Sequence, residues 1–264
     1  MEKSTTFLSG PEMAPPDDEL LRLSEHPSSA ERLAARVWNK AGGLLSSLAA
    51  QLQLETGVAV AVFCVESGGD GFGPGGRMLI RFENHHFFRH WGKANSEVFH
   101  THFQFDAKRP WTGHRWRASA AGEFELVHCG QAGEWRAFEF ARSLDETAAK
   151  LSISMGSPQI LGSNHAAAGF GSVHEMFDAF SSSERRQIEA FFDFLQKSEA
   201  QPRMVPALRQ KDFRRFAELY NGPGNAAAYG EKIKQMYDTF ERLRAARKPG
   251  GETILDVMEQ LQDV

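Results

Sequence analysis

The sequence predicts a mainly α-helical (α+β) protein with a small β-rich insertion in its middle. Two observations predict this class. The C-terminal part of the chain has repeated helix-capping signals and apolar residues at helical spacing, whereas residues 99–135 show strand-like alternation and many turn residues. The 264 residues are 41% hydrophobic with a net charge of −4. This composition is typical of a folded chain and argues against intrinsic disorder and nucleic-acid binding.

The ends of the chain carry few signals of fixed structure. Residues 1–27 are polar and proline-rich, without the apolar segment of a signal peptide, and are expected to form a flexible leader. Residues 28–246 are expected to form one folded domain, and residues 247–264 a tail with a short helix. No stretch approaches the roughly 18 consecutive apolar residues of a membrane span. Synthesis in the cytoplasm and no membrane insertion are therefore expected.

The first helix is predicted to begin after Ser28, because Ser28 and Glu31 have capping-box spacing and leucines follow at helical intervals. Gly42-Gly43 is expected to be a weak point of this helix. Val58–Val65 is an apolar run whose β-branched residues favour a strand and whose length also fits a buried helix, so periodicity leaves both open. Glu66 follows this run directly, before a glycine-rich turn.

The middle of the chain is predicted to be rich in β-structure. Met78–Phe82 fits a short strand, and residues 99–105 alternate phenylalanine with polar side chains, as a half-buried strand does. Residues 106–135 contain turn residues, tryptophans and short apolar pieces, which predicts an irregular insertion. Cys64 and Cys129 are the only cysteines, so at most one disulfide can form.

The C-terminal part is predicted to be helical. Three serine–glutamate pairs at capping-box spacing indicate helix starts: Ser143/Glu146, Ser172/Glu175 and Ser181/Glu184. Four apolar stripes at i, i+3, i+4, i+7 spacing are expected to face the core: Val173, Met176, Phe177 and Phe180; Ile188, Phe191, Phe192 and Leu195; Phe213, Phe216, Ala217 and Tyr220; and Ile233, Met236, Tyr237 and Phe240.

Glu66 is the first candidate for chemistry. A carboxylate directly after eight apolar residues is poorly solvated, and at the end of a helix it would also face the negative end of the dipole, so both effects predict a raised pKa. A carboxylic acid that stays protonated near neutral pH suits general-acid catalysis of glycoside cleavage. Ser67-Gly68-Gly69 would let a ligand approach the backbone closely. The plainer interpretation is a glutamate that reaches solvent at the end of an element.

Two later turns carry side chains that suit sugar recognition. Ser154–Ile160 is a turn with one amide side chain, Gln159, and Tyr220-Asn221 ends a helical stripe before a Gly-Pro loop. Amide and phenol groups on turns are suited to hydrogen bonds with sugar hydroxyls and N-acetyl groups.

Three segments, in this order, resemble the signatures of the lysozyme superfamily: Glu66-Ser67-Gly68-Gly69, Ser154-Met155-Gly156-x-x-Gln159-Ile160 and Tyr220-Asn221-Gly222-Pro223-Gly224. The closer resemblance is to the N-acetylmuramidase family of phage endolysins and bacterial cell-wall hydrolases. Two further segments look like family segments: Leu79-Ile80-Arg81-Phe82-Glu83, followed by Asn84-His85-His86-Phe87, and Gly162-Ser163-Asn164-His165. The resemblance covers roughly residues 44–240.

The resemblance implies a lysozyme-like helical domain and a glycoside hydrolase that works without a cofactor or metal. Its partner would be the glycan strands of peptidoglycan, cleaved at the β-1,4 bond between N-acetylmuramic acid and N-acetylglucosamine. Glu66 would be the general acid, and Glu83 a carboxylate facing it across the cleft as base or nucleophile. The substrate-binding residues would be Ser67, Gln159, Tyr220 and Asn221. The chain has Met155-Gly156-Ser157-Pro158-Gln159 where the family commonly has Trp-Gly-Leu-Phe-Gln, so the shape of that subsite is open.

The sequence leaves the second carboxylate and the stereochemistry open. Asp70 and Asp106 are substitutes for Glu83 in the second role. A carboxyl separation of about 5 Å would indicate retention, and one of about 6.5–9.5 Å inversion. Without a second carboxylate, attack by the muramyl 6-hydroxyl would make the protein a lytic transglycosylase, which needs one acid/base.

Two other classes compete with a metal-free hydrolase. His100-Thr101-His102 on a strand would place two imidazoles on one face, which could start the zinc site of a metal-dependent amidase or peptidase. No His-Glu-x-x-His is present, so hydrogen bonding or surface exposure is the favoured interpretation of these histidines. The other class is a non-catalytic glycan-binding module. In a hydrolase or a binding module, Trp111 and Trp116 are the candidates for stacking on sugars.

The inferred substrate lies outside the cytoplasmic membrane, which raises the question of delivery. Release through a phage holin, or transport by a contractile injection apparatus, would bring the protein to the cell wall or periplasm. The sequence does not distinguish these routes.

Overall fold

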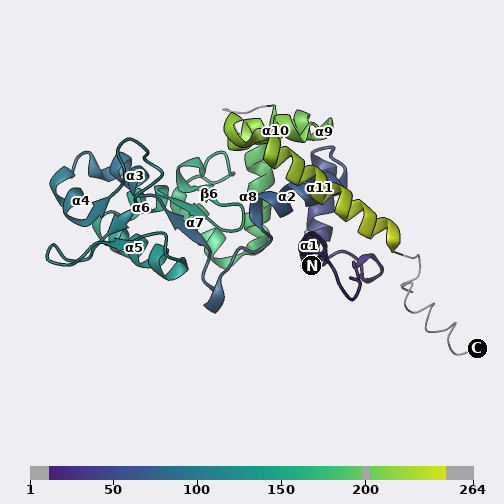
Figure 1. Cartoon of the computed structure of the whole chain (residues 1–264), viewed down its shortest axis with the longest axis horizontal. Coiled ribbons are helices and arrows are strands. Elements are labelled where there is room, and N and C mark those ends of the chain that lie inside the picture. The colour runs from purple at the N-terminus through teal and green to yellow at the C-terminus, as the bar shows by residue number, and fades with distance from the viewer. Residues whose placement is uncertain (1–11, 198–202, 248–264) are drawn as a thin grey trace, which may run out of the picture. The chain divides into compact units, whose positions relative to one another are not determined.

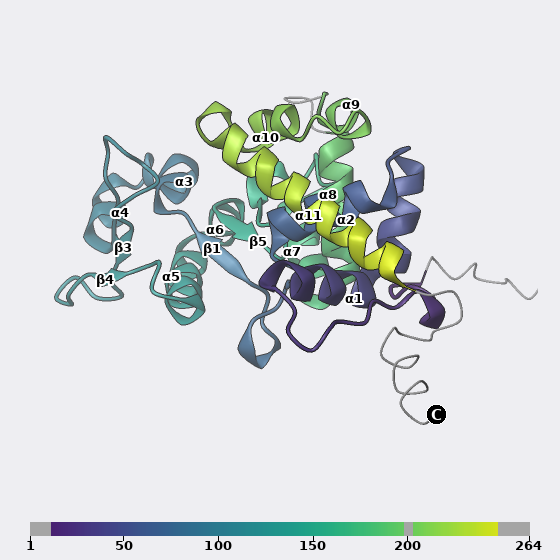
Figure 2. The same cartoon turned by 45° about the vertical axis from the view of Figure 1, so that its right-hand side comes forward.

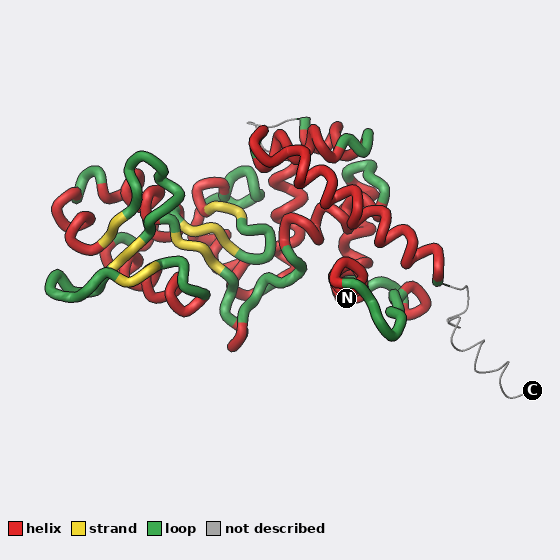
Figure 3. The backbone as a smooth tube through the Cα atoms, in the orientation of Figure 1, coloured by secondary structure: helices red, strands yellow, loops and turns green. Residues whose placement is uncertain are grey.

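The computed structural model describes residues 12–197 and 203–247 and is mainly α-helical, with two small antiparallel sheets (Figure 3). The chain divides into two compact units. Unit 1 combines Met1–Gly69 with Gln201–Val264, and unit 2 is Asp70–Ala200. Unit 2 is thus inserted in the sequence between two helical parts of unit 1.

Unit 1 is built around a central apolar helix. Its helices are α1 (Ser29–Gln51), α2 (Thr56–Ser67), α9 (Met204–Arg209), α10 (Phe213–Asn221) and α11 (Ala226–Ala246). α2 packs against both α1 and α11, and α11 lies beside α2 in both views (Figure 1, Figure 2). The residues Gly57–Cys64 of α2 are all buried, which explains why the run is apolar on every side. The open choice at Val58–Val65 is therefore settled as a helix.

The predicted start of α1 is confirmed, and the predicted break is wrong. Ser28 and Glu31 form a complete capping box. α1 continues through Gly42 and Gly43, where the missing side chains allow close packing. A Cβ atom on Gly43 would lie 2.3 Å from the carbonyl oxygen of Ala14, and one on Gly42 would lie 2.7 Å from the Trp38 ring.

Part of the expected flexible leader contacts α1. The Met13 carbonyl accepts hydrogen bonds from the backbone N–H groups of Gly43 and Leu44, and the Trp38 indole N–H donates to the Glu19 carbonyl. Residues 1–11, and residues 248–264 with the predicted tail helix, lie outside the described residues.

Unit 2 contains both sheets. Its helices are α3 (Asn84–Phe87), α4 (Ser96–His102), α5 (Gln131–Leu144), α6 (Glu146–Leu151), α7 (Val173–Ser182) and α8 (Glu184–Lys197), and its strands are β1 (Ile80–Phe82), β2 (Phe103–Gln104), β3 (Arg115–Trp116), β4 (Glu125–Leu126), β5 (Ile153–Met155) and β6 (Ile160–Leu161). One sheet has the order β1-β5-β6 and the other β2-β3-β4. The predicted strand near Met78–Phe82 and the irregular β-rich insertion are confirmed.

The prediction of a strand over residues 99–105 is wrong for most of its length. Residues 99–102 end α4, and only Phe103–Gln104 form a strand, which pairs with β3. Phe99 and Phe103 are both fully buried. Because they are four residues apart, the same two side chains satisfy a helical period, and packing against their neighbours decides between the two.

The C-terminal helix signals are confirmed in part. Ser172 caps α7 as predicted, but Ser143 and Ser181 lie inside helices. Asp145 caps α6 instead, and the Ser183 hydroxyl accepts from the Arg186 N–H at the start of α8. All four predicted stripes are buried, except that Tyr220 and Tyr237 are half-buried.

Cys64 is buried in unit 1, Cys129 is exposed in unit 2, and both are free thiols. In the described part of the chain, no single helix is both long and apolar enough to cross a bilayer. α1 and α2 reach that composition only as a pair bent by 115°.

Candidate active site

Glu66 is the second-last residue of α2 and is half-buried in unit 1. Burial raises the pKa of its carboxyl group to about 7, against smaller opposing effects of a hydrogen bond from Asn221 and the charge of Lys232. The predicted direction of the pKa shift is therefore confirmed, and desolvation is its main cause. Such a group is half protonated near neutral pH, as a general acid requires.

The end of α2 is fixed by hydrogen bonds. The Ser67 hydroxyl donates to the Phe63 carbonyl and accepts from the Gly69 N–H at 3.0 Å. Gly68 ends the helix with a φ of 63°, a left-handed conformation that favours glycine. Because its hydroxyl already has these backbone partners, Ser67 shapes the turn beside Glu66.

Two cations of α1 bind the last carbonyls of this turn. Arg36 Nη2 donates to the Gly68 carbonyl at 2.8 Å, and Lys40 Nζ to the Gly69 carbonyl at 2.7 Å. Positive charge at this end offsets the negative pole of the helix dipole. The dipole effect predicted for Glu66 is thus countered locally, and burial remains as the cause of the raised pKa.

Tyr220 and Asn221 end α10 beside Glu66. Asn221 Nδ2 donates to Glu66 Oε1 at 3.1 Å. The Tyr220 ring stacks on Phe216 with centroids 5.6 Å apart. Burial, with a smaller contribution from the Glu66 charge, raises the pKa of Tyr220. Unit 1 therefore brings together Glu66, Tyr220 and Asn221, three of the residues chosen from the sequence.

Glu83 lies in unit 2, between β1 and α3, and is half-buried. Its Oε1 accepts from Arg81 Nε at 2.7 Å. Its Oε2 lies 3.5 Å from His85 Nδ1 and 3.4 Å from His114 Nδ1. These three atoms lie within 4.8 Å of one another and form a cluster that could hold a metal ion. We call Glu83, His85 and His114 the Glu-His-His cluster.

Both histidines of this cluster favour the neutral form. Burial lowers the pKa of His85 and of His114, although the neighbouring Glu83 charge opposes it. Glu83 is a candidate from the sequence, whereas its two partners, His85 and His114, are identified only from the structure. The spacing Glu-x-His directly after a strand was the available signal for His85, whereas His114 comes from a distant turn.

The predicted pair of imidazoles at His100 and His102 does not form. Both residues are in α4, and residues two apart in a helix point to nearly opposite sides. His100 Nδ1 contacts the Ser96 carbonyl at 2.7 Å, and His102 Nδ1 contacts the Arg117 carbonyl at 2.9 Å. These contacts agree with the favoured interpretation of hydrogen bonding, and the alternative of a zinc site that starts at this pair is wrong.

Gln159 lies in the turn between β5 and β6 and is exposed. Its φ is 49°, a left-handed conformation that is uncommon for a residue other than glycine. Its side-chain amide donates to the Gly156 carbonyl at 2.8 Å. The side chain thus braces its own turn while it remains accessible to a ligand.

Trp111 and Trp116 have different surroundings. Trp111 is 65% exposed, whereas Trp116 is 6% exposed and pairs with Phe103 across β2 and β3. Of the two, Trp111 offers the more exposed ring for stacking on a sugar.

A pocket of about 850 Å³ in unit 2 is lined by Gly73, Arg77, Trp116, Gln131, Ala132, Trp135, Arg136 and Glu139.

Asp106, a substitute for the second carboxylate, is occupied in a turn. Its Oδ1 accepts from the backbone N–H groups of Lys108 and Arg109, and these bonds lower its pKa. This arrangement indicates a structural carboxylate.

Comparisons with known proteins agree with the resemblance in the sequence. The sequence model of the N-acetylmuramidase family matches residues 55–241, which is more than half of the chain and includes Glu66, Glu83, Gln159, Tyr220 and Asn221. Among solved structures, the crystal structure of the Burkholderia AP3 phage endolysin is similar. It is 29% identical, with a TM-score of 0.59, over 84% of this chain and 74% of that chain. No curated protein matches the sequence.

Proposed function

Because the chain belongs to the N-acetylmuramidase family, we propose that it cleaves peptidoglycan between N-acetylmuramic acid and N-acetylglucosamine, with Glu66 as the general acid. Family membership and the likeness to a phage endolysin support peptidoglycan hydrolysis in general. The observation that carries the specific proposal is the burial of Glu66 at the end of an apolar helix, which raises its pKa to about 7.

The hydrogen bond from Asn221 indicates which oxygen of Glu66 carries the proton. Asn221 Nδ2 is a donor, so Glu66 Oε1 acts as the acceptor and the proton resides on Oε2. In the proposed mechanism Oε2 donates this proton to the glycosidic oxygen as the bond to the anomeric carbon breaks. The poorly solvated surroundings of Glu66 keep it protonated until then.

Four residues are proposed to contact the sugars. Tyr220 and Asn221 lie beside Glu66 and offer a hydroxyl and an amide, and Gln159 offers an exposed amide. Trp111 offers an exposed ring face. Ser67 and Trp116 are proposed to act indirectly, since Ser67 fixes the end of α2 and Trp116 is buried in its sheet.

Glu83 is the proposed second carboxylate for hydrolysis, as base or nucleophile. A specific observation favours an alternative chemistry. Arg81 and two histidines already surround the carboxyl group of Glu83, which favours Glu66 as the single acid/base. In that case the muramyl 6-hydroxyl attacks the anomeric carbon, gives up its proton to Glu66, and leaves an anhydro-muramic end.

Mass spectrometry of digested peptidoglycan tests both chemistries. The wild type is compared with Glu66→Gln and Glu83→Gln, with Glu55→Gln as the control. Glu55 is an exposed glutamate at the other end of α2, paired with Lys211 and Tyr237. Reducing muramic ends indicate hydrolysis, and anhydro-muramic ends indicate transglycosylation. A Glu66→Gln variant that digests peptidoglycan at the wild-type rate would refute the proposal, and so would a digest that contains only peptide or amide cleavage.

We further propose that the protein acts on the cell wall after delivery. The similarity to a phage endolysin supports release through a holin, with a contractile injection apparatus as the other route. Lysis that requires co-expression of a holin in a bacterial host would support the first route.

A further inference from the structure

The Glu-His-His cluster has the donor set and spacing of a transition-metal site. Glu83 Oε2 lies 3.5 Å from His85 Nδ1 and 3.4 Å from His114 Nδ1. Zn²⁺ bonds of about 2.0–2.1 Å at a tetrahedral centre place the ligand atoms roughly 3.3–3.4 Å apart. A charge-assisted hydrogen bond would instead draw a pair of such atoms to about 2.7–2.9 Å. The two separations from Glu83 Oε2 match ligands arranged around a shared centre, and all three ligand atoms lie within 4.8 Å of one another.

The tautomer of the His114 imidazole also fits metal binding. His114 Nε2 lies 2.8 Å from the Pro110 carbonyl, which can only accept, so Nε2 carries the hydrogen and Nδ1 carries the lone pair. A backbone carbonyl that fixes the tautomer in this way is typical of metal-binding histidines. The backbone N–H of Asn84 donates a long hydrogen bond of 3.4 Å to Nδ1, which indicates a lone pair at that atom, and a metal ion bound there would replace this bond.

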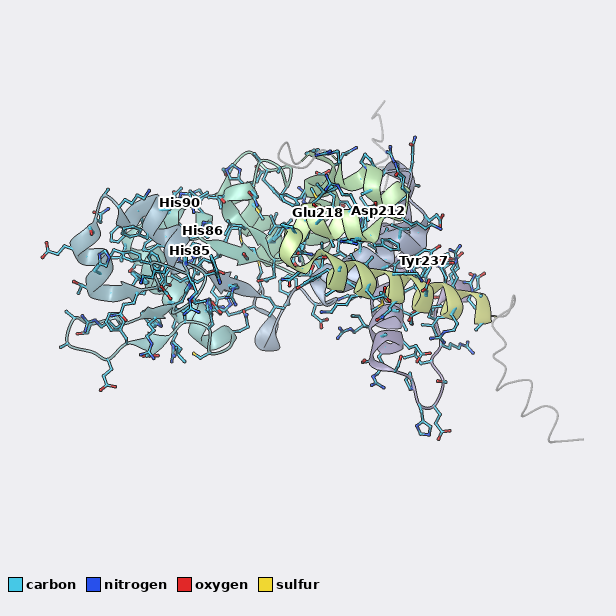
Figure 4. The ribbon with its side chains drawn as sticks, turned by 45° about the horizontal axis from the view of Figure 1, so that its top comes forward. His85, His86, His90, Asp212, Glu218 and Tyr237 are labelled. Atoms are coloured by element: carbon cyan, nitrogen blue, oxygen red, sulfur yellow. The ribbon has the colours of Figure 1, made fainter. Side chains whose placement is uncertain are left out.

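The cluster leaves buried polar atoms unsatisfied. Among the described residues, Glu83 Oε2 and His85 Nδ1 have no hydrogen-bond partner, although both are buried. His86 Nδ1 and His128 Nε2, which flank the cluster, are in the same condition. The ring centroids of His86 and His85, which are labelled in Figure 4, are 4.3 Å apart. The ring centroids of His128 and His114 are 4.7 Å apart. Buried polar groups without partners are costly, and a bound cation would satisfy the two on Glu83 and His85.

Neighbouring contacts hold the ligands in place. Asn84 is buried between Glu83 and His85, and its side-chain amide donates to the carbonyls of Gln104 and Arg115, both at 2.7 Å. These bonds tie the start of α3 to the strands on either side of the turn that carries His114. The site therefore joins two segments distant in the sequence.

We propose that Glu83 Oε2, His85 Nδ1 and His114 Nδ1 bind a divalent transition-metal ion of the Zn²⁺ type, which stabilises unit 2. Two imidazoles and one carboxylate suit Zn²⁺ and its neighbours better than Mg²⁺ or Ca²⁺, which prefer oxygen ligands. His128 is a candidate for the fourth position, because its ring centroid is 4.7 Å from that of His114, its Nδ1 is bonded to Glu134 at 2.8 Å and its buried Nε2 has no partner. The proposal is independent of the role of Glu66, but it assigns Glu83 to metal binding and therefore goes with the chemistry in which Glu66 is the single acid/base.

The metal content of the protein tests the proposal. The full chain, without a polyhistidine tag, is stripped of metal with a chelator and then dialysed against Zn²⁺ and against metal-free buffer. Its zinc content is measured by inductively coupled plasma mass spectrometry. One Zn²⁺ per chain is expected for the wild type and for His100→Ala, the control, because His100 is an exposed histidine of the same unit. His85→Ala and His114→Ala are expected to lose at least nine-tenths of it.

Two further readouts keep the test independent of folding and activity. Zn²⁺ is expected to raise the melting temperature of the wild type and of His100→Ala, and to leave that of His114→Ala unchanged. X-ray absorption at the zinc edge should show nitrogen and oxygen ligands at about 2.0–2.1 Å and no sulfur. Less than one-tenth of a Zn²⁺ per wild-type chain, or equal zinc in all variants, would overturn the proposal. Neither result would bear on cleavage by Glu66, which is measured separately with Glu66→Gln.

Discussion

Glu66 lies at the end of the apolar helix α2 and Glu83 directly follows the short strand β1, yet the two units surround them differently. In unit 1, Glu66 is half-buried with one amide donor, and burial raises its pKa to about 7. In unit 2, Glu83 meets a guanidinium group and two imidazoles within 3.5 Å. We therefore propose different roles for the two carboxyl groups, a proton donor in unit 1 and a metal ligand in unit 2. The neighbouring polar side chains, more than burial alone, make the difference.

Replacing each glutamate in turn is the strongest test of whether Glu66 and Glu83 have different roles. We expect Glu66→Gln to lower kcat by about 10²–10⁴-fold, the usual contribution of general acid–base catalysis. Peptidoglycan turbidity assays at pH 6 measure this. Glu55→Gln should retain wild-type activity. An equal loss in Glu83→Gln would give the two carboxylates equivalent catalytic roles and remove the contrast.

The pH profile sharpens the comparison further. Because Glu66 must be protonated to donate, and its pKa is raised to about 7, kcat should fall about tenfold per pH unit above pH 7. Rates measured at saturating substrate from pH 5 to 9 test this. A rate that stays constant to pH 9 would contradict the role of Glu66 as the acid.

Stability should reveal the burial of Glu66 without any substrate. A pKa raised from 4.5 to about 7 favours the protonated folded state, so this contribution is complete below pH 4.5 and is lost as the pH rises through 7. Glu66→Gln cannot ionise. The free energy of unfolding of the variant, minus that of the wild type, should therefore be larger at pH 8.5 than at pH 4 by at most about 3 kcal/mol. Urea unfolding at both pH values measures the gain. Glu55→Gln should show no gain and instead a small loss relative to the wild type from pH 4 to pH 8.5, because hydrogen bonds from Lys211 and Tyr237 lower the pKa of Glu55.

The smallest expected effect concerns Asn221. Its hydrogen bond lowers the pKa of Glu66, so Asn221→Ala should move the alkaline limb of the activity profile to higher pH. A shift to lower pH would mean that Asn221 stabilises the protonated carboxyl group instead. Asn225→Ala, an exposed asparagine in the turn that follows α10, is the matched control.

The parts of the fold that depend on local pattern could be predicted from the sequence. The stripes of α7, α8, α10 and α11, the cap at Ser28 and the raised pKa of Glu66 follow from neighbours within a few residues. Residues 99–102 could not be predicted, because the spacing of Phe99 and Phe103 fits both periods and distant packing decides. The helix starts near Ser143 and Ser181 could not be predicted for a local reason, because Asp145 and Ser183, two residues further along, provide the hydrogen bonds at the helix starts instead.

The candidate site could be predicted only where motifs of the family supply the residues. Glu66, Tyr220 and Asn221 come from two motifs that the family resemblance connects, and unit 1 brings them together. The partnership of Glu83 with His114 depends on a contact across about thirty residues of chain. The sequence offered His100 and His102 only as a disfavoured alternative for a metal site, since alternation suggested a strand where the chain forms a helix.

The two cations at the end of α2 have a consequence for how the protein responds to its medium. Arg36 and Lys40 bind the carbonyls of Gly68 and Gly69, so the charge of this helix end is balanced within the protein. The pKa of Glu66 then depends chiefly on exclusion from water, which dissolved ions do not screen, unlike interactions between exposed charges. The pKa of Glu66, the proposed proton donor, should therefore change little with ionic strength, and the pH range of activity should be nearly the same in dilute and in concentrated salt.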